Sequence, residues 1–237
     1  MHLEIYPTHN HLNGDSIEDK NVVIIDVLRA TSVIANALNN GASKIKTVAS
    51  IEDAFLQKAN NSELILGGER NAQKVTGFDF GNSPLEYSRE KIAYKTVLLC
   101  TTNGTQAVEK SKRAKRIVAA SFLNLKSITD YLINIKEDTI VICSGTNGNF
   151  SLDDGLCAGL LLHELRKCKT ISTNDFGELL LLPFENKNFD LKNTLKKASH
   201  LKYLESKGYG SDIQYCLEIN YLTILPIWEN DGFIHKE

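Results

Sequence analysis

Val22-Val23-Ile24-Ile25-Asp26-Val27-Leu28-Arg29-Ala30-Thr31 is the most informative short segment of the chain. Its first four residues are apolar and β-branched, which is typical of a strand buried on both faces. A helical pattern follows over Thr31 to Leu38, and Gly41 is placed to end that helix. A strand that leads directly into a helix is the repeating unit of α/β proteins, so this segment predicts that fold class.

Two further segments have the same design. Apolar strands are expected at Thr96–Cys100 and Thr139–Cys143. Thr101-Thr102-Asn103-Gly104-Thr105 follows the first strand, and Ser144-Gly145-Thr146-Asn147-Gly148 follows the second. The shared Thr-Asn-Gly triplet would suit two related α/β lobes, about residues 1–125 and 126–237. A coincidence of two turn-forming Asn-Gly pairs is the simpler explanation, and we favour it.

The remaining elements are predicted from local patterns. Ser50 with Asp53 is expected to cap a helix that runs through Phe55 to Ala59. Further strands and helices are expected where apolar residues are continuous or follow helical spacing. The strands are Leu64–Leu66, Ile117–Ala119 and Leu222–Leu225, the last ended by Pro226, and the helices are Leu123–Ile135 and Leu156–Leu165. We therefore predict one α/β domain over residues 1–237, with a mixed or mostly parallel sheet flanked by helices.

The composition describes an ordinary soluble globular protein. Of its 237 residues, 42% are hydrophobic and 24% are charged, and the formal net charge is −2. Such a chain has no general attraction to nucleic acid or to anionic lipid, so neither is expected as a partner. Without a signal peptide or an apolar run long enough to cross a bilayer, we expect a cytoplasmic protein. Its five widely spaced cysteines are expected to be free thiols. Small metabolic enzymes are commonly homo-oligomers, so we also consider a homo-oligomer.

Polar residues follow the predicted strands at the points where each strand ends. In open α/β sheets, ligands bind outside the carboxyl ends of the strands, so these loops should converge on one crevice. Asp26 ends a strongly apolar strand, and a carboxylate there must be paired, hydrogen-bonded or bound to a metal. Arg29 is close enough in sequence to pair with it. A buried Asp–Arg pair that only ties the strand to the helix is the alternative, and the pattern alone favours neither interpretation.

A second carboxylate stands beside a guanidinium in Gly67-Gly68-Glu69-Arg70. Two glycines permit a close approach to a ligand, and arginine suits bidentate contact with phosphate or sulfonate oxygens. The alternative is a surface turn with a solvated charge pair.

Two more carboxylates, Asp153 and Asp154, open the predicted helix before Leu156. Alone they are more simply explained as ordinary first-turn charges that suit the helix dipole. Together with Asp26 and Glu69 they supply hard oxygen donors, which fit Mg²⁺.

Several better-known catalytic motifs are missing from the chain. His163-Glu164-Leu165-Arg166-Lys167 begins like a zinc-protease helix, but Lys167 replaces the second histidine. The sequence contains no P-loop, no tyrosine-phosphatase loop and no Gly-x-Ser-x-Gly nucleophile elbow. An aspartyl-phosphate enzyme of the haloacid dehalogenase type is not supported either, because no aspartate follows two residues after Asp26.

Taken together, the motifs resemble those of the 2-phosphosulfolactate phosphatases, the ComB family. They occur in the expected order over almost the whole chain. They are Ile25–Ser32, Gly68–Arg70, Gly77–Pro84, Thr101–Thr105 and Phe150–Asp154 with Cys157–Gly159, while Ser199-His200, Asp212 and Leu225-Pro226 resemble the family's C-terminal end. Two positions depart from the family pattern: Asp153 stands where glutamate is expected, and Asn71-Ala72 where glycines are expected.

The resemblance implies a Mg²⁺-dependent phosphatase that converts 2-phosphosulfolactate to 3-sulfolactate and phosphate, a step of coenzyme M biosynthesis in methanogens. Asp26, Glu69 and Asp154 would bind the metal directly or through water, and Asp26 could instead be a nucleophile or a general base. Arg29 and Arg70 would hold the anionic groups of the substrate. The substrate would also be bound by loop residues, namely Thr31, Asn82, Thr102, Asn103, Gly104 and Thr105.

Two alternatives remain open at this stage. The same chemistry could act on another small phosphorylated hydroxy acid. The crevice could also belong to a non-catalytic anion-binding sensor or carrier, which would need the glycines and arginines but no metal.

Overall fold

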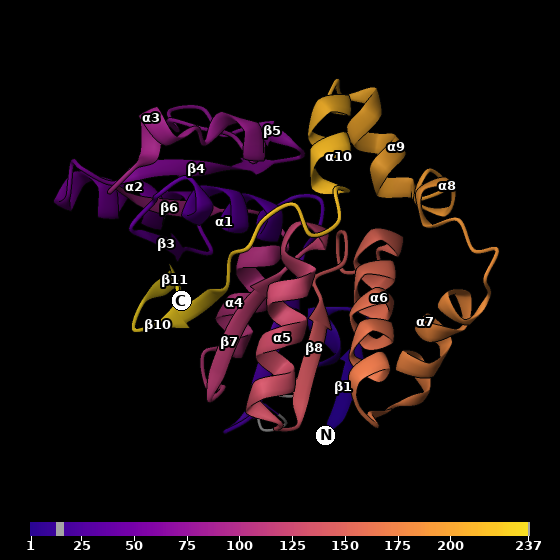
Figure 1. The fold of residues 1–237 in the computed structure, drawn as a ribbon. Helices are drawn as coiled ribbons and strands as arrows, with labels where there is room; N and C mark the ends of the chain where they lie inside the picture. The colour runs from indigo at the N-terminus through magenta and orange to yellow at the C-terminus, as the bar shows by residue number, and fades with distance from the viewer. Residues whose placement is uncertain (13–16, 237) are drawn as a thin grey trace.

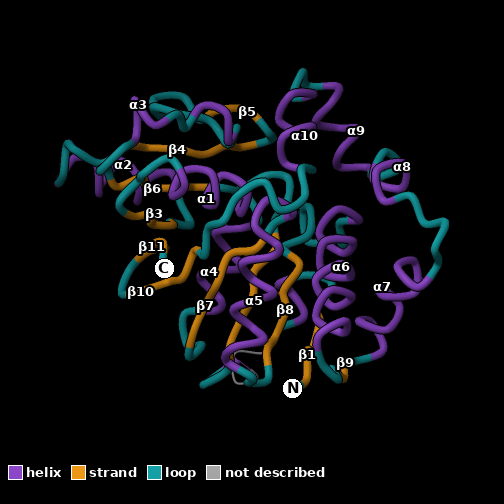
Figure 2. Tube along the Cα trace, viewed as in Figure 1, coloured by secondary structure: helices purple, strands orange, loops and turns teal. Residues whose placement is uncertain are grey.

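A single mixed sheet runs through the computed structural model, which describes residues 1–12 and 17–236 (Figure 1). Within the described residues it has eleven strands in the order β5-β4-β6-β3-β11-β10-β7-β2-β8-β1-β9. Helices cover both of its faces, which confirms the predicted α/β fold with a mixed sheet (Figure 2). No helix in this part of the chain is long and apolar enough to cross a membrane.

The bounds of the strands are as follows: β1 (His2–Tyr6), β2 (Asn21–Ile25), β3 (Lys44–Thr47), β4 (Ile65–Arg70), β5 (Gln73–Lys74), β6 (Thr96–Cys100), β7 (Arg116–Ala120), β8 (Thr139–Cys143), β9 (Ser172–Thr173), β10 (Pro226–Glu229) and β11 (Gly232–His235). The α-helices are α1 (Ala30–Asn39), α2 (Ile51–Asn60), α3 (Arg89–Ile92), α4 (Gly104–Ser111), α5 (Leu125–Ile135), α6 (Leu152–Cys168), α7 (Asp175–Glu185), α8 (Leu191–Leu195), α9 (Ser199–Ser206) and α10 (Gly210–Cys216). Short 3-10 helices lie at His9–His11, Pro84–Glu86 and Phe122–Asn124.

The strands fall into two parallel groups, which the C-terminal hairpin joins. Strands β4, β6 and β3 are parallel to one another, and β7, β2, β8, β1 and β9 form the second parallel group. The hairpin β10–β11 lies between them and pairs antiparallel with β7 on one side and β3 on the other. The last strands of the chain therefore close the middle of the sheet.

The predicted strand Leu222–Leu225 is wrong, because the strand begins at Pro226 instead of ending there. Proline is tolerated as the first residue of a strand, since it only lacks an N–H at that position. Leu222 and Ile224 are buried in the core although they lie in an irregular segment. These residues are therefore apolar because they pack in the core, and not because they belong to a strand.

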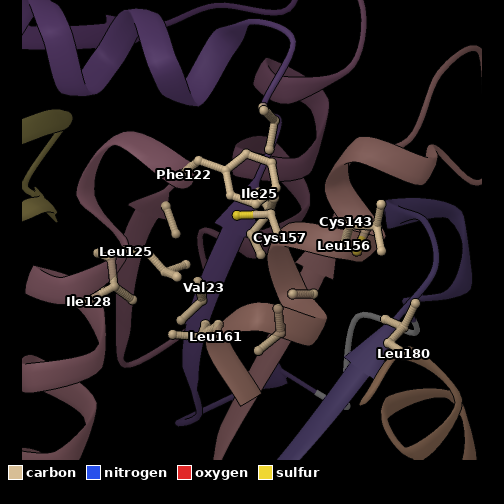
Figure 3. Packing of buried hydrophobic residues seen from close by; sticks show 14 of the residues in the cluster. Val23, Ile25, Phe122, Leu125, Ile128, Cys143, Leu156, Cys157, Leu161 and Leu180 are labelled. Carbon is tan, nitrogen blue, oxygen red and sulfur yellow. The ribbon is translucent and has the colours of Figure 1, made fainter. Parts of the chain in front are cut away.

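Side chains of β2 alternate between two hydrophobic clusters, one on each face of the sheet. Val23 and Ile25 face the cluster that contains α5 and α6, whose packing Figure 3 shows. Val22 and Ile24 face the cluster that contains α1. Because both faces of β2 are covered, the continuous apolar run that predicted a buried strand has a direct physical cause.

Most local predictions are confirmed. The strands at Thr96–Cys100 and Thr139–Cys143 have the predicted bounds. Ser50 caps α2, because its Oγ accepts a hydrogen bond from the Asp53 N–H at 3.0 Å. Helix α6 begins at Leu152, so Asp153 and Asp154 lie in its first turn as predicted. All five cysteines are free, and Cys168 is the exposed one.

Candidate active site

A cavity of about 300 Å³ lies where the carboxyl ends of β2, β4, β6 and β8 meet the C-terminal helix α9. Polar residues reach it from every one of these segments. They are Asp26 and Arg29 after β2, Glu69 on β4, Thr102 and Asn103 after β6, Thr146 and Asn147 after β8, and His200 and Tyr203 on α9. The expectation that polar loops converge outside the strand ends is thus met.

Asp26 lies at the end of β2 and is 7% exposed. Its Oδ1 accepts a hydrogen bond from the Ala30 N–H at 3.0 Å, and Oδ2 accepts none from the described residues. Burial raises the pKa of Asp26 from 3.8 to about 6, and the charges of Asp153 and Glu69 add to the rise, while the Ala30 N–H and His200 oppose it. The carboxylate thus has a free oxygen and a proton affinity near the neutral range.

Gly104 is needed beside this free oxygen. A Cβ at position 104 would lie 2.7 Å from Asp26 Oδ2 and 2.6 Å from the Ala30 Cβ, so any side chain would displace one of them. Gly104 begins α4 and does not itself line the cavity. The absence of a side chain at Gly104 therefore leaves space for the Asp26 carboxylate, and Gly104 itself does not contact the ligand.

Arg29 lines the cavity but does not pair with Asp26, so that predicted ion pair is wrong. Its Nη1 donates instead to Asp212 Oδ2 at 2.5 Å, and both side chains are almost fully buried. Asp212 lies on α10, 183 residues further along the chain. No local pattern around Arg29 could have indicated this partner.

Glu69 and Arg70 are neighbours on β4, but their side chains lie on opposite faces of the strand. Glu69 lines the cavity: its Oε1 accepts the N–H and Oγ1–H of Thr102 at 2.9 and 2.8 Å, and its Oε2 accepts the Ala72 N–H at 2.8 Å. Arg70 does not line it and donates to Ala49 O and Cys100 Sγ. The strand that was predicted to end at Leu66 instead continues through both glycines to Arg70, and successive side chains of a strand point to opposite faces. The surface turn considered as the alternative does not form.

Asp154 connects two loops and does not line the cavity. Its Oδ1 accepts the Val27 N–H and its Oδ2 accepts the Gly145 N–H, each at 2.9 Å. Burial, and next the charge of Asp153, raise the pKa of Asp154 well above its ordinary value. Burial also raises the pKa of Asp153, whose Oδ1 accepts the Ser151 hydroxyl. Asp154 therefore fixes the loops around the site, while Asp26 and Glu69 form part of the cavity wall.

The two Thr-Asn-Gly segments meet across the cavity. Asn103 Oδ1 accepts the Asn147 N–H at 3.1 Å, and Thr102 and Thr146 line the same space. Of the loop residues expected to bind substrate, Asn82, Thr102 and Asn103 line the cavity. Thr31 and Thr105 do not, because their hydroxyls donate to the carbonyls of Asp26 and Thr101, which stabilises the starts of α1 and α4.

His200, Tyr203 and Asn71 also line the cavity, and sequence reasoning assigned them no role. The His200 Nε2 donates to the Leu28 carbonyl at 2.8 Å, and Tyr203 Oη donates to the Asn71 carbonyl at 3.1 Å. Two enclosed polar atoms in the lining residues, His200 Nδ1 and Asn82 Oδ1, have no hydrogen-bond partner among the described residues. The only signal for the α9 residues was the short C-terminal resemblance at Ser199-His200.

The carboxylates of the cavity wall determine whether Mg²⁺ fits this site. The described residues contain no cluster of three histidine, cysteine or acidic side chains that would enclose a metal. Mg²⁺ does not need one, since it usually keeps several waters and takes one or two carboxylates plus substrate phosphate. Asp26 with its free Oδ2 and Glu69 in the cavity wall provide that number of carboxylates. The residues present therefore fit Mg²⁺, with Asp154 outside the set.

Comparisons with known proteins agree with this arrangement of motifs. The sequence model of the 2-phosphosulpholactate phosphatase family matches residues 6–231. The chain belongs to this family. It is thereby a phosphoric monoester hydrolase, and this family implies a small-molecule substrate.

Several relatives share the full length of the chain. A probable 2-phosphosulfolactate phosphatase of Thermotoga maritima is 46% identical over 93% of this chain and 94% of its own. Those of Caldanaerobacter subterraneus and Clostridium beijerinckii are 40% and 38% identical, covering 97% and 100% of this chain and 96% and 100% of their own. The similarity is thus not confined to the motifs around the cavity.

Proposed function

We propose that this protein hydrolyses 2-phosphosulfolactate to 3-sulfolactate and phosphate with the help of Mg²⁺. The observation that carries the proposal is the cavity, in which Asp26, Glu69 and Arg29 meet hydroxyl and amide groups at the carboxyl ends of four strands. The names of the family and of its relatives support the choice of substrate. We also propose that the protein works in the cytoplasm without a nucleic-acid or membrane partner, and a homo-oligomer is compatible with this role.

Asp26 and Glu69 would hold the metal ion. When bound, Mg²⁺ would neutralise phosphoryl oxygens and favour ionisation of an attacking water. The raised pKa of Asp26 would also suit a general base. The two roles are separable, because a ligand contributes to metal affinity and a base does not.

Arg29 would bind an anionic group of the substrate. The guanidinium is buried and fixed, so its free N–H groups are oriented before the substrate enters. The side-chain amides of Asn103 and Asn147 would donate further hydrogen bonds from the two loops that face each other. Thr102, whose N–H and hydroxyl both donate to Glu69, would hold that carboxylate in place. Donors that are held in place before the reaction need no reorganisation as negative charge shifts between oxygens.

The test is phosphate release by the purified protein from 2-phosphosulfolactate and from related phosphorylated hydroxy acids that lack the sulfonate. Each substrate is assayed with Mg²⁺ and with EDTA, and Arg29→Ala is the matched control. We expect release that requires Mg²⁺, is fastest with the sulfonate and is lost in Arg29→Ala. Faster turnover of another ester would support the proposed reaction but assign it to a different substrate. Saturable anion binding without turnover, unaffected by EDTA, would indicate a binding protein instead.

A further inference from the structure

The buried ion pair between Arg29 and Asp212 is the most constrained polar contact of the cavity. The side chain of Arg29 is 2% exposed and that of Asp212 is 6% exposed, and the two atoms Nη1 and Oδ2 are 2.5 Å apart. Taking two charges out of water is costly, so such a pair adds little net stability compared with apolar residues of similar size. Stability alone is therefore a weak reason for this pair.

Both partners are held from further sides. The other oxygen of Asp212, Oδ1, accepts the Ser83 hydroxyl at 2.7 Å. Arg29 Nη2 donates to the Ala72 carbonyl at 3.3 Å, and the guanidinium carbon lies 4.0 Å from the centre of the Tyr209 ring. The guanidinium is thus fixed by a carboxylate, a carbonyl and an aromatic face.

The fixed guanidinium still has donors to offer. Arginine carries five N–H groups in a planar fork. Two of them are donated to Asp212 and Ala72, and the described residues accept none of the others. Because Arg29 lines the cavity, the unused N–H groups are available to an oxyanion there.

We infer that Asp212 is the positioning residue of Arg29, and that helix α10 thereby sets the orientation in which the guanidinium meets the oxyanion of the substrate. This inference rests on the proposed role of Arg29. Figure 1 shows that α9 and α10 lie beyond the upper ends of β8 and α6. Residues of α9 and of the loop after β8 line the same cavity. Helix α10 thus contributes to the site through a residue that does not line the cavity.

The experiment is a double-mutant cycle with Asp212→Asn and Arg29→Ala. Asparagine keeps the shape of the carboxylate and removes its charge. Misplacing a catalytic group by about 1 Å can cost roughly 100-fold, so we expect Asp212→Asn to lower kcat/KM by about 10- to 100-fold. If Asp212 acts through Arg29, the double variant will be no slower than Arg29→Ala alone. Losses that multiply in the double variant, or full activity of Asp212→Asn, would overturn the inference.

Two further variants keep the test decisive. Ser83→Ala removes only the hydrogen bond to Asp212 Oδ1 and leaves both charges of the ion pair in place. It therefore serves as the test variant if Asp212→Asn does not fold. We expect a smaller loss in the same direction, again absent when Arg29 is alanine. Asp231→Asn is the control, because Asp231 pairs with Lys44 and Lys46 on the surface and does not line the cavity. It should leave kcat/KM unchanged.

The same cycle can be measured without turnover. The affinity for inorganic phosphate, determined by calorimetry for the four proteins of the cycle, should show the same coupling between Asp212 and Arg29. If the wild type hydrolyses no ester, the proposed function fails while the affinity cycle still decides the role of Asp212. Phosphate binding that is independent of Arg29, or absent, would contradict the inference.

Discussion

Replacement of Asp26 by asparagine should stabilise the protein while removing its activity. In the folded protein the pKa of Asp26 rises from 3.8 to about 6, because the carboxylate is buried near other carboxylates. A shift of one pKa unit corresponds to about 1.4 kcal/mol, so ionising Asp26 costs the fold about 3 kcal/mol above pH 6. Asparagine carries no charge and its Oδ1 can still accept the Ala30 N–H. We expect a gain of about 1–3 kcal/mol in the free energy of unfolding at pH 8 in EDTA.

The pH dependence of this gain tests its cause. A raised carboxyl pKa destabilises the fold above the folded pKa, and the penalty disappears as the pH falls from about 6 toward 3.8, where both states bind the proton. The difference between variant and wild type, measured by chemical denaturation, should therefore shrink between pH 6 and pH 4. Asp231→Asn should instead lower the stability at pH 8, because its lysine partners lower the pKa of Asp231 from 3.8 to about 2. That loss should shrink only as the pH falls from about 4 toward 2. Equal or lower stability of Asp26→Asn at pH 8 would refute the electrostatic argument.

Two further outcomes follow from the placement of the charged residues. Mg²⁺ should raise the unfolding temperature of the wild type but not that of Glu69→Gln or Asp26→Asn, as measured by thermal denaturation at increasing Mg²⁺. A full Mg²⁺ response in both variants would exclude them as ligands. Arg29→Ala should lower kcat by about 100- to 1,000-fold, the usual cost of one charge-stabilising donor. Arg70→Ala should keep most of the activity, because Arg70 contacts Ala49 and Cys100 instead of lining the cavity. Similar losses in both arginine variants would place Arg70 in the site after all.

The fold was predictable where the local pattern has a single structural cause. The run Val22–Ile25 is apolar because both of its faces are covered, and a polar segment followed by helical spacing indicated α1. The hairpin β10–β11 was missed because its place in the sheet depends on pairing with β3 and β7, which lie more than a hundred residues earlier in the chain. Pairing between distant strands leaves no trace in the spacing of neighbouring residues.

The same distinction applies to the candidate site. Asp26 and Glu69 were found because a carboxylate at or near the end of an apolar strand is unusual. The partner of Arg29 was assigned wrongly, since the nearest carboxylate in sequence is Asp26 while the one in contact is Asp212. Arg70 was expected beside the ligand because the two glycines before it were interpreted as flexible backbone at a strand end. Gly68 instead allows close approach of β4 to β6, since a Cβ there would lie 1.9 Å from the Cys100 carbonyl oxygen.

From the charges around the cavity we predict that the proposed metal and the substrate bind cooperatively. Asp26 and Glu69 line the cavity, and the charge of Arg29 is already offset by Asp212. A phosphoester that also carries acidic groups would meet net negative charge in a buried site, where repulsion is poorly screened. A divalent cation bound by the two carboxylates would neutralise that charge. By linkage, each ligand must then raise the affinity for the other by the same factor. The dissociation constant of Mg²⁺, measured by calorimetry, should therefore fall when inorganic phosphate is present at saturation. An unchanged constant would show that the two do not share the cavity.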